Sequence, residues 1–132
     1  MAQETSSQIV IFGSIPSTHD QQAIDAVRST EFKPVLFNDE NSAIDELEYC
    51  RAIIAAIRYN SVHLDVTGVK LLTEAGQLGV PRAILTPPEL GWWVADKVQI
   101  TKQDVSLPLG HRRPRIEQGI VAWLAKLSET RD

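Results

Sequence analysis

Short apolar runs are separated along this chain by longer segments of mixed apolar and polar residues. Three runs are almost continuously apolar and rich in branched side chains: Gln8–Phe12 (QIVIF), Arg51–Ile57 (RAIIAAI) and Val80–Leu85 (VPRAIL). A fourth, Lys33–Phe37 (KPVLF), has a proline near its start, where a strand tolerates one. Such runs are typical of strands buried on both faces of a parallel sheet. The pattern therefore predicts four strands, of which the third has an alternative.

Between these runs, apolar side chains recur at intervals of three and four residues. This spacing predicts helices over residues 19–29, 69–78 and 116–127. The weaker apolar segment Lys97–Ile100 is predicted to be a fifth strand. Ser106–Pro114, which contains two prolines and a glycine, is predicted to be a loop.

The segment from Ser42 to Tyr59 has two interpretations. Its apolar residues fall at helical spacing, so one helix could run to Tyr59 and place the third strand at Ser61–Val66. Alternatively, a short helix ends near Tyr49, the strand is Arg51–Ile57, and a ten-residue loop follows. Periodicity does not separate a buried strand from a buried helical segment of this length. We favour the strand at Arg51–Ile57, and both interpretations leave five strands.

Alternating strands and helices predict a parallel sheet with helices on both faces. Five strands in 132 residues suit a three-layer α/β/α sandwich with the flavodoxin-like strand order 2-1-3-4-5. We expect one domain over residues 8–128, preceded by a disordered polar tail at residues 1–7. Ligands of such folds bind outside the carboxyl ends of the strands. The predicted pocket residues at this edge are Gly13, Ser14, Asn38, Asp39, Arg58 and Asn60, with Thr86 and Lys102 beside them.

Composition argues against several classes of function. The net charge of -4 argues against general binding to nucleic acids or anionic membranes, which requires a basic surface. The one cysteine, Cys50, makes no internal disulfide and is expected to be a small core residue. No apolar run approaches the roughly 20 residues of a membrane span. The N-terminal residues resemble no secretory leader, so we expect a cytoplasmic location.

The residues that could carry chemistry are few. The first turn, GSIPSTHD, lacks the second glycine and the lysine of a phosphate-binding P-loop, and helix capping is its favoured role. His19, His63 and His111 are not spaced as metal ligands, and we expect neither a metal nor a cofactor. Five carboxylates between Asp39 and Glu48 are expected to interact with a helix dipole and solvent; the alternative is a surface for a divalent metal or basic partner.

Trp92 and Trp93 are the predicted interaction residues. Adjacent side chains on a strand or a helix point in different directions, so we expect one ring to pack inward and the other to stay partly exposed. Exposed tryptophans are frequent anchors of protein interfaces. The pair therefore predicts contact with a protein partner or with a second copy of the chain.

Residues 51–102 resemble the second half of a response-regulator receiver domain. RAIIAAIR resembles the third strand of that family, DVTGVKLL the next turn and helix, and VPRAILT the fourth strand with its final threonine. ADKVQITK resembles the fifth strand with its lysine. The resemblance implies a flavodoxin-like fold and a role in signalling.

The same resemblance implies that phosphorylation chemistry is missing. Gly13 and Ser14 stand where receivers carry acidic magnesium ligands, and Ala56 stands near the phosphoacceptor aspartate. Thr86 and Lys102 match the threonine and lysine that read out phosphorylation. The implied function is a non-catalytic, phosphorylation-independent pseudo-receiver that binds a protein partner or itself through four residues: Thr86, Trp92, Trp93 and Lys102.

A second resemblance gives the alternative function. CRAIIAAI, a variable loop and GVKLLTEAGQLGVPRAIL are similar to nucleoside 2-deoxyribosyltransferases and their TIR-like relatives. The catalytic glutamate of that family aligns with Leu71 or Leu72, two or three residues before Glu74. The resemblance implies an enzyme that cleaves N-glycosidic bonds with Glu74, with Ser14 and Tyr59 around the sugar.

Overall fold

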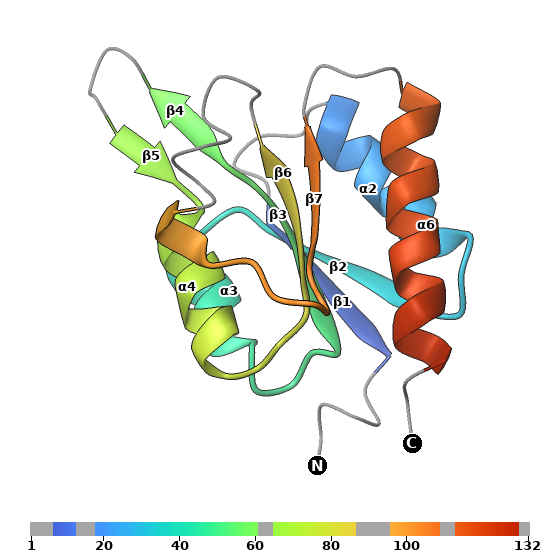
Figure 1. The fold of residues 1–132 in the computed structure, drawn as a ribbon, viewed down its shortest axis with the longest axis horizontal. Helices are drawn as coiled ribbons and strands as arrows, with labels where there is room; N and C mark the ends of the chain where they lie inside the picture. Colours follow the sequence, from blue (N-terminus) through green and yellow to red (C-terminus); the bar gives the residue numbers. More distant parts are fainter. Residues whose placement is uncertain (1–6, 13–17, 61–64, 87–95, 109–112, 130–132) are drawn as a thin grey trace.

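The computed structural model describes residues 7–12, 18–60, 65–86, 96–108 and 113–129. Five parallel strands form one sheet in the order β2-β1-β3-β6-β7 (Figure 1). Their bounds are β1 (Gln8–Phe12), β2 (Lys33–Phe37), β3 (Ala52–Ala56), β6 (Arg82–Thr86) and β7 (Val105–Pro108). In chain order within this sheet the arrangement is 2-1-3-4-5, so the predicted flavodoxin-like topology is confirmed.

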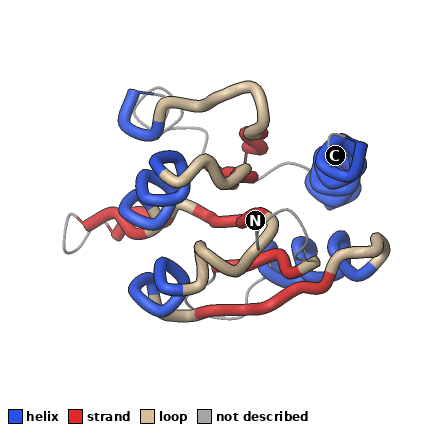
Figure 2. Tube along the Cα trace, turned by 90° about the horizontal axis from the view of Figure 1, so that it is seen from below, coloured by secondary structure: helices blue, strands red, loops and turns tan. Residues whose placement is uncertain are grey.

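Helices cover both faces of the sheet (Figures 1 and 2). On one face α2 (Thr18–Arg28) packs beside α6 (Arg113–Glu129), and on the other α3 (Glu40–Asp45) packs beside α4 (Val69–Gln77). Each pair closes its own apolar cluster against the strands. The molecule is therefore the predicted three-layer sandwich. None of the described helices is both long and apolar enough to cross a bilayer.

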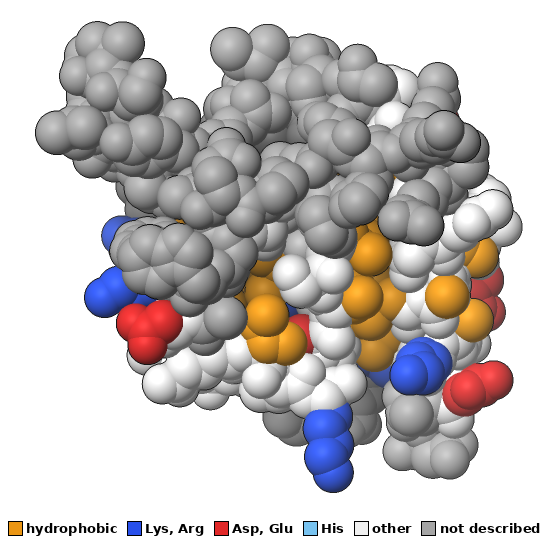
Figure 3. Space-filling view, turned by 45° about the horizontal axis from the view of Figure 1, so that its top comes forward, with side chains coloured by type: hydrophobic (Ala, Val, Ile, Leu, Met, Phe, Trp, Pro, Cys, Tyr) orange, Lys and Arg blue, Asp and Glu red, His pale blue; other side chains and the backbone are white. Residues whose placement is uncertain are grey.

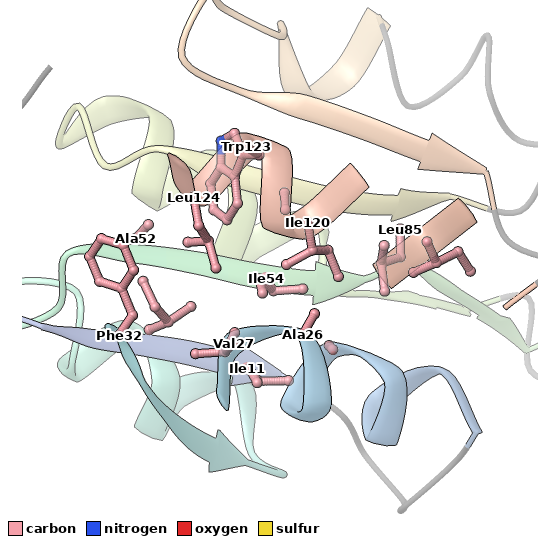
Figure 4. Close-up of a cluster of buried hydrophobic side chains, with 14 of the residues drawn as sticks. Ile11, Ala26, Val27, Phe32, Ala52, Ile54, Leu85, Ile120, Trp123 and Leu124 are labelled. Atoms are coloured by element: carbon pink, nitrogen blue, oxygen red, sulfur yellow. The ribbon is translucent and has the colours of Figure 1, made fainter. Parts of the chain in front are cut away.

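The central strands supply side chains to both clusters in alternation. In β3, Ile54 packs toward α2 and α6, whereas Ile53 packs toward α3 and α4. Figure 4 shows Ile54 among Ile11, Leu85 and residues of α6. Because both faces of each central strand are buried, every position benefits from an apolar side chain, worth roughly 1.5–3 kcal/mol for a large aliphatic one.

The ambiguous segment is resolved in favour of the strand. β3 spans Ala52–Ala56, within the predicted Arg51–Ile57, and α3 ends at Asp45 before a series of turns. The apolar residues at helical spacing do not belong to one helix, because Leu47 and Cys50 lie in the segment after α3 and Ile57 directly follows the strand. All three pack in the same cluster.

The predicted ten-residue loop after β3 is wrong in part. Residues Arg58–Asn60 (β4) and Asp65–Thr67 (β5) form an antiparallel pair with Arg58 opposite Thr67. In Figure 1 this pair projects past the ends of the neighbouring strands. Strands of three residues are too short to produce a periodic pattern, so they could not be predicted from the spacing of apolar residues.

The predicted fifth strand at Lys97–Ile100 is also wrong. Residues 96–98 are helical, Gln99 has a φ of 57°, and the strand beside β6 is β7 (Val105–Pro108). Val105 and Leu107 of β7 pack against the cluster under α6. The predicted loop at Ser106–Pro114 is therefore wrong at both ends, where the chain forms the end of β7 and the start of α6, and residues 109–112 lie outside the described residues. Pro108 misled the prediction, although an edge strand tolerates proline at its end.

At the amino end of the sheet, hydrogen bonds from Arg51 connect β1 to α6. The backbone N–H of Arg51 donates to the Gln8 carbonyl at 2.8 Å, and the Arg51 guanidinium donates to the Leu127 carbonyl of α6 at 3.0 Å. The Ser7 carbonyl accepts from Lys33 N–H at 2.8 Å. Ser7 is thus already tied to β2, whereas the rest of the predicted tail, residues 1–6, lies outside the described residues.

Candidate functional site

The carboxyl ends of the parallel strands define the edge at which the predicted site lies. β3 ends at Ala56, which is 4% exposed, and Ile57 follows with its side chain fully buried. Both side chains are aliphatic, so neither can accept a phosphoryl group. In Figure 3 the described acidic and basic side chains are scattered and form no single patch of either sign.

The start of α4 packs directly on the end of β3. Gly68, the N-cap of α4, has a φ of 99°, and a Cβ atom at this position would lie 2.9 Å from the Ala56 carbonyl oxygen. Only glycine combines this left-handed backbone with so close an approach. The backbone of Gly68 therefore occupies the space beside the end of β3.

Thr86 lies at this edge, at the carboxyl end of β6, as predicted. It is 4% exposed, and its Oγ1 is buried without a hydrogen-bond partner in the described part of the chain. An unsatisfied buried hydroxyl costs about 1–3 kcal/mol. Alternation along β6 puts Thr86 on the face of Ile84, toward α3 and α4. Thr86 is thus a buried hydroxyl with hydrogen-bonding capacity to spare.

The predicted pocket residue Asp39 is engaged as a helix cap. Its Oδ2 accepts hydrogen bonds from the backbone N–H of Ser42 at 3.0 Å and from the Ser42 hydroxyl at 2.9 Å. The next residue, Glu40, reaches across to α4, where its Oε2 accepts from the Leu71 N–H at 3.1 Å. Two carboxylates of the acidic run therefore satisfy helix N-termini, the favoured role of that run. Asn38 lies in the turn just before this cap.

Lys102 does not lie at the carboxyl edge, so its predicted placement beside Thr86 is wrong. It is exposed in the turn that precedes β7, whereas Thr86 is paired with Pro108 at the far end of that strand. The error follows from the shifted fifth strand. Leu107, opposite Leu85, stands near the end of β7, where the resemblance implied a lysine.

Several predicted site residues are not placed in full. Gly13, Ser14, Trp92 and Trp93 lie outside the described residues. Arg58, Tyr59 and Asn60 are placed only by their backbone, as the strand β4.

Of the three residues of the alternative enzyme site, Glu74 lies on α4. Glu74 is half-buried in this helix, and its neighbours Leu71 and Leu72 are fully buried in the core. The position that aligns with the catalytic glutamate is therefore a packing position.

A buried ionic cluster that was not predicted from the sequence lies at the amino end of β6. Arg82 is 1% exposed, and its Nη1 donates to the carbonyl oxygens of Leu72 at 2.9 Å and Val98 at 3.2 Å. Its Nη2 donates to the Gln99 carbonyl at 3.1 Å and to the Asp104 carboxylate at 2.5 Å. The guanidinium thus joins α4, the segment 96–99 and the turn before β7.

Asp104 completes this cluster from the other side. Its carboxylate also accepts from the backbone N–H of Arg82 at 2.9 Å and from the N–H and hydroxyl of Thr101 at 2.8 and 3.0 Å. Burial by itself would raise the pKa of Asp104, but the hydrogen bonds from Arg82 and Thr101 outweigh it and hold the pKa below its usual range. Gly76 makes room for the guanidinium, because a Cβ there would lie 2.8 Å from Arg82 Nη1.

Cys50 is the small core residue that the sequence predicted. It is fully buried, and its thiol donates to the Leu47 carbonyl at 3.7 Å. Burial raises its pKa to about 12, against a smaller opposite effect of backbone hydrogen bonding. The thiol stays protonated at neutral pH, and a protonated buried thiol is a poor nucleophile.

Comparison with known proteins supports the architecture. No protein-family model matches the sequence, and no curated protein does. Among solved structures, the REC domain of AraT, a response regulator from Geobacillus stearothermophilus, matches with a TM-score of 0.68 at 13% identity, over 97% of this chain and 100% of its own. The signal receiver domain of an HD domain-containing protein from Pseudomonas fluorescens Pf-5 matches with a TM-score of 0.66 at 14% identity, over 94% of this chain and 98% of its own. The chain has the receiver-domain fold.

The same fold is shared with a protein made without a natural ancestor. A de novo designed Rossmann 2x3 protein matches with a TM-score of 0.59 at 12% identity, over 91% of this chain and 90% of its own. Identities this low establish the fold only. The predicted resemblance to receivers is confirmed at that level, and the chemistry must be argued from this chain's own residues.

Proposed function

We propose that this domain is a non-catalytic signalling domain of receiver-like architecture that acts by binding a protein partner or a second copy of itself. The observation that carries the proposal is the aliphatic end of β3, where Ala56 and Ile57 leave no carboxylate to accept a phosphoryl group. A domain of this architecture without that carboxylate can still present a surface. We place its action in the cytoplasm.

Two further contacts support independence from phosphorylation. Gly68 packs against the Ala56 carbonyl oxygen. Asp39 and Glu40 are already engaged with the first turns of α3 and α4. Both features favour a fixed surface at this edge over a reaction centre.

The proposed partner surface comprises Thr86, Trp92 and Trp93. Thr86 contributes a buried hydroxyl at the end of β6 that has no hydrogen-bond partner among the described residues. The tryptophans follow it in the chain and would supply apolar anchors. Lys102, at the opposite end of β7, would belong to a different surface.

Treatment with acetyl phosphate and magnesium tests the phosphorylation-independent part of the proposal. We expect the intact mass of the protein to remain unchanged, while a receiver domain with an intact aspartate, treated in parallel, gains a phosphoryl group. An aspartyl-phosphate adduct on this chain would refute the proposal.

Replacing Trp92 and Trp93 together by alanine tests the surface. We expect weaker self-association in light scattering, or weaker capture of a partner, with an unchanged far-UV circular dichroism spectrum. Tyr49→Ala is the matched control, because Tyr49 is an exposed aromatic residue, 57% accessible, in the turn before β3. Loss of the folded spectrum in the double variant would make the tryptophans core residues and remove them from the surface.

An assay for cleavage of N-glycosidic bonds distinguishes the alternative enzyme function from the proposed one. Release of free base from nucleosides or NAD, abolished by Glu74→Gln, would overturn the non-catalytic proposal. The burial of Leu71 and Leu72 gives that alternative no support.

A further inference from the structure

A hollow of about 230 Å³ lies between α4 and the segment 96–101, near the amino end of the sheet. It is away from the carboxyl edge that carries the proposed partner surface. Its lining presents both polar and apolar surface and comprises Thr73, Gly76, Gln77, Arg82, Lys97, Val98, Gln99 and Thr101. Among the described residues, the lining contains two cations and no carboxylate.

Arg82 lines this hollow with one hydrogen-bond donor unused. A guanidinium has five N–H groups. Four acceptors match the four N–H groups on Nη1 and Nη2. The fifth, on Nε, is buried and has no acceptor in the described part of the chain. Buried donors are nearly always paired with an acceptor, and the described residues leave this charged donor without one.

The wall of the hollow also contains a strained residue. Gln99 has a φ of 57°, a left-handed conformation that a residue with a Cβ rarely adopts. Its carbonyl oxygen accepts from Arg82 Nη2, so the strained backbone is held against the guanidinium. Strained residues that the surrounding structure keeps in place are concentrated at binding sites.

We propose that this hollow binds a small molecule that carries a carboxylate or phosphate group. An oxygen of that group would accept from Arg82 Nε, and the exposed ammonium of Lys97 would balance its charge. Asp104 already neutralises the charge of Arg82. The preference for an anion therefore comes from the positive charge of Lys97. The volume is below the roughly 300–1,000 Å³ of sites for drug-sized ligands, which favours a compact metabolite.

The test is a titration of the ¹⁵N-labelled full chain, observed by NMR. Sodium succinate and inorganic phosphate are added separately, with sodium chloride holding the ionic strength constant. We expect a saturable shift of the Arg82 Nε–H resonance, together with the backbone amides of Gln99 and Thr101. Saturation by one anion alone identifies whether the site takes a carboxylate or a phosphate.

Two variants make the result specific. Lys97→Gln removes one exposed cation and should weaken the saturating anion on the order of 3- to 5-fold. Lys33→Gln removes an exposed cation outside the hollow and should leave the affinity unchanged. The proposal is overturned if neither anion saturates, if chloride produces the same shifts, or if both variants weaken binding equally. It concerns a different site from the proposed function, and the failure of one leaves the other standing.

Discussion

Arg82 shows how one residue can organise a segment that has little regular structure of its own. Residues 96–104 contain one helical turn and no strand, and the guanidinium binds Val98, Gln99 and Asp104 within it. Burying an ion pair is costly, and the pair is stable only when its remaining donors and acceptors are also satisfied. Removing one partner leaves an uncompensated buried charge.

Asp104→Asn should therefore destabilise the protein strongly. We expect the free energy of unfolding in urea to fall by about 3–5 kcal/mol at pH 7, because Arg82 loses its counter-charge inside the fold. The double variant Arg82→Met with Asp104→Leu serves as the control and should recover much of that loss. A cost below about 1 kcal/mol for Asp104→Asn would place it in the range of exposed pairs and contradict the buried cluster.

The lowered pKa of Asp104 sets the pH range in which this stabilisation is lost. The folded pKa lies below the ordinary value of 3.8, so the unfolded chain takes up the proton first as the pH falls. The contribution is complete above that ordinary value and disappears as the pH falls through the folded pKa. Below pH 4 the wild type should lose stability more steeply than Asp104→Asn in urea melts. Parallel slopes would contradict the assignment.

At the residue scale, the sequence contained a usable indication of this cluster. Arg82 stands inside an otherwise apolar run, VPRAIL, that was predicted to be buried on both faces. A charged residue in such a strand is seldom fully buried without a partner. The partner itself could not be predicted. Asp104 lies 22 residues after Arg82, and with the fifth strand predicted at Lys97–Ile100 it would follow that strand and not precede it.

At the scale of elements, the glycines at the two ends of α4, Gly68 and Gly79, are required for different reasons. Both have positive φ, 99° and 73°, but only Gly68 approaches other backbone; a Cβ on Gly79 would meet nothing within 4 Å. Gly79→Ala should cost about 1–2 kcal/mol for the left-handed conformation alone. Gly68→Ala should cost measurably more in the same thermal unfolding assay, since its Cβ would also clash with Ala56. If both variants lost the same stability, the backbone around Ala56 would be able to move away from the new Cβ at no measurable cost.

The predictability of each element follows from its burial. β1, β3 and β6 are buried nearly throughout, and the sequence located all three within about two residues. The edge strand β7 is only half-buried, and its apolar residues Val105 and Leu107 are too few to indicate a strand that ends in a proline. Of the candidate site, Thr86 was found because it ends a buried strand. Lys102 was misplaced with the strand to which it was assigned.

At the scale of the molecule, two apolar clusters share a single sheet. Leu124 belongs to the cluster under α6 and Leu71 to the cluster under α4, and both side chains are fully buried. Either leucine replaced by alanine should cost about 2–5 kcal/mol. Because strands such as β3 contribute to both clusters, we expect one cooperative transition with the same urea m-value for both variants, observed alike by circular dichroism and tryptophan fluorescence. A biphasic curve in either variant would show that the two layers unfold separately.

Arg51 holds both ends of the described chain, through Gln8 at the start of β1 and Leu127 near the end of α6. A backbone of nine residues spans roughly 30 Å when extended, and residues 1–6 together with 130–132 number nine. Joining Asp132 to Met1 should then close the chain without disturbing the core. New termini opened in the turn between α2 and β2 would give a circular permutant with the same sheet. In such a molecule the order of the elements along the chain would change, while the carboxyl edge and the Arg82 hollow would stay where they are.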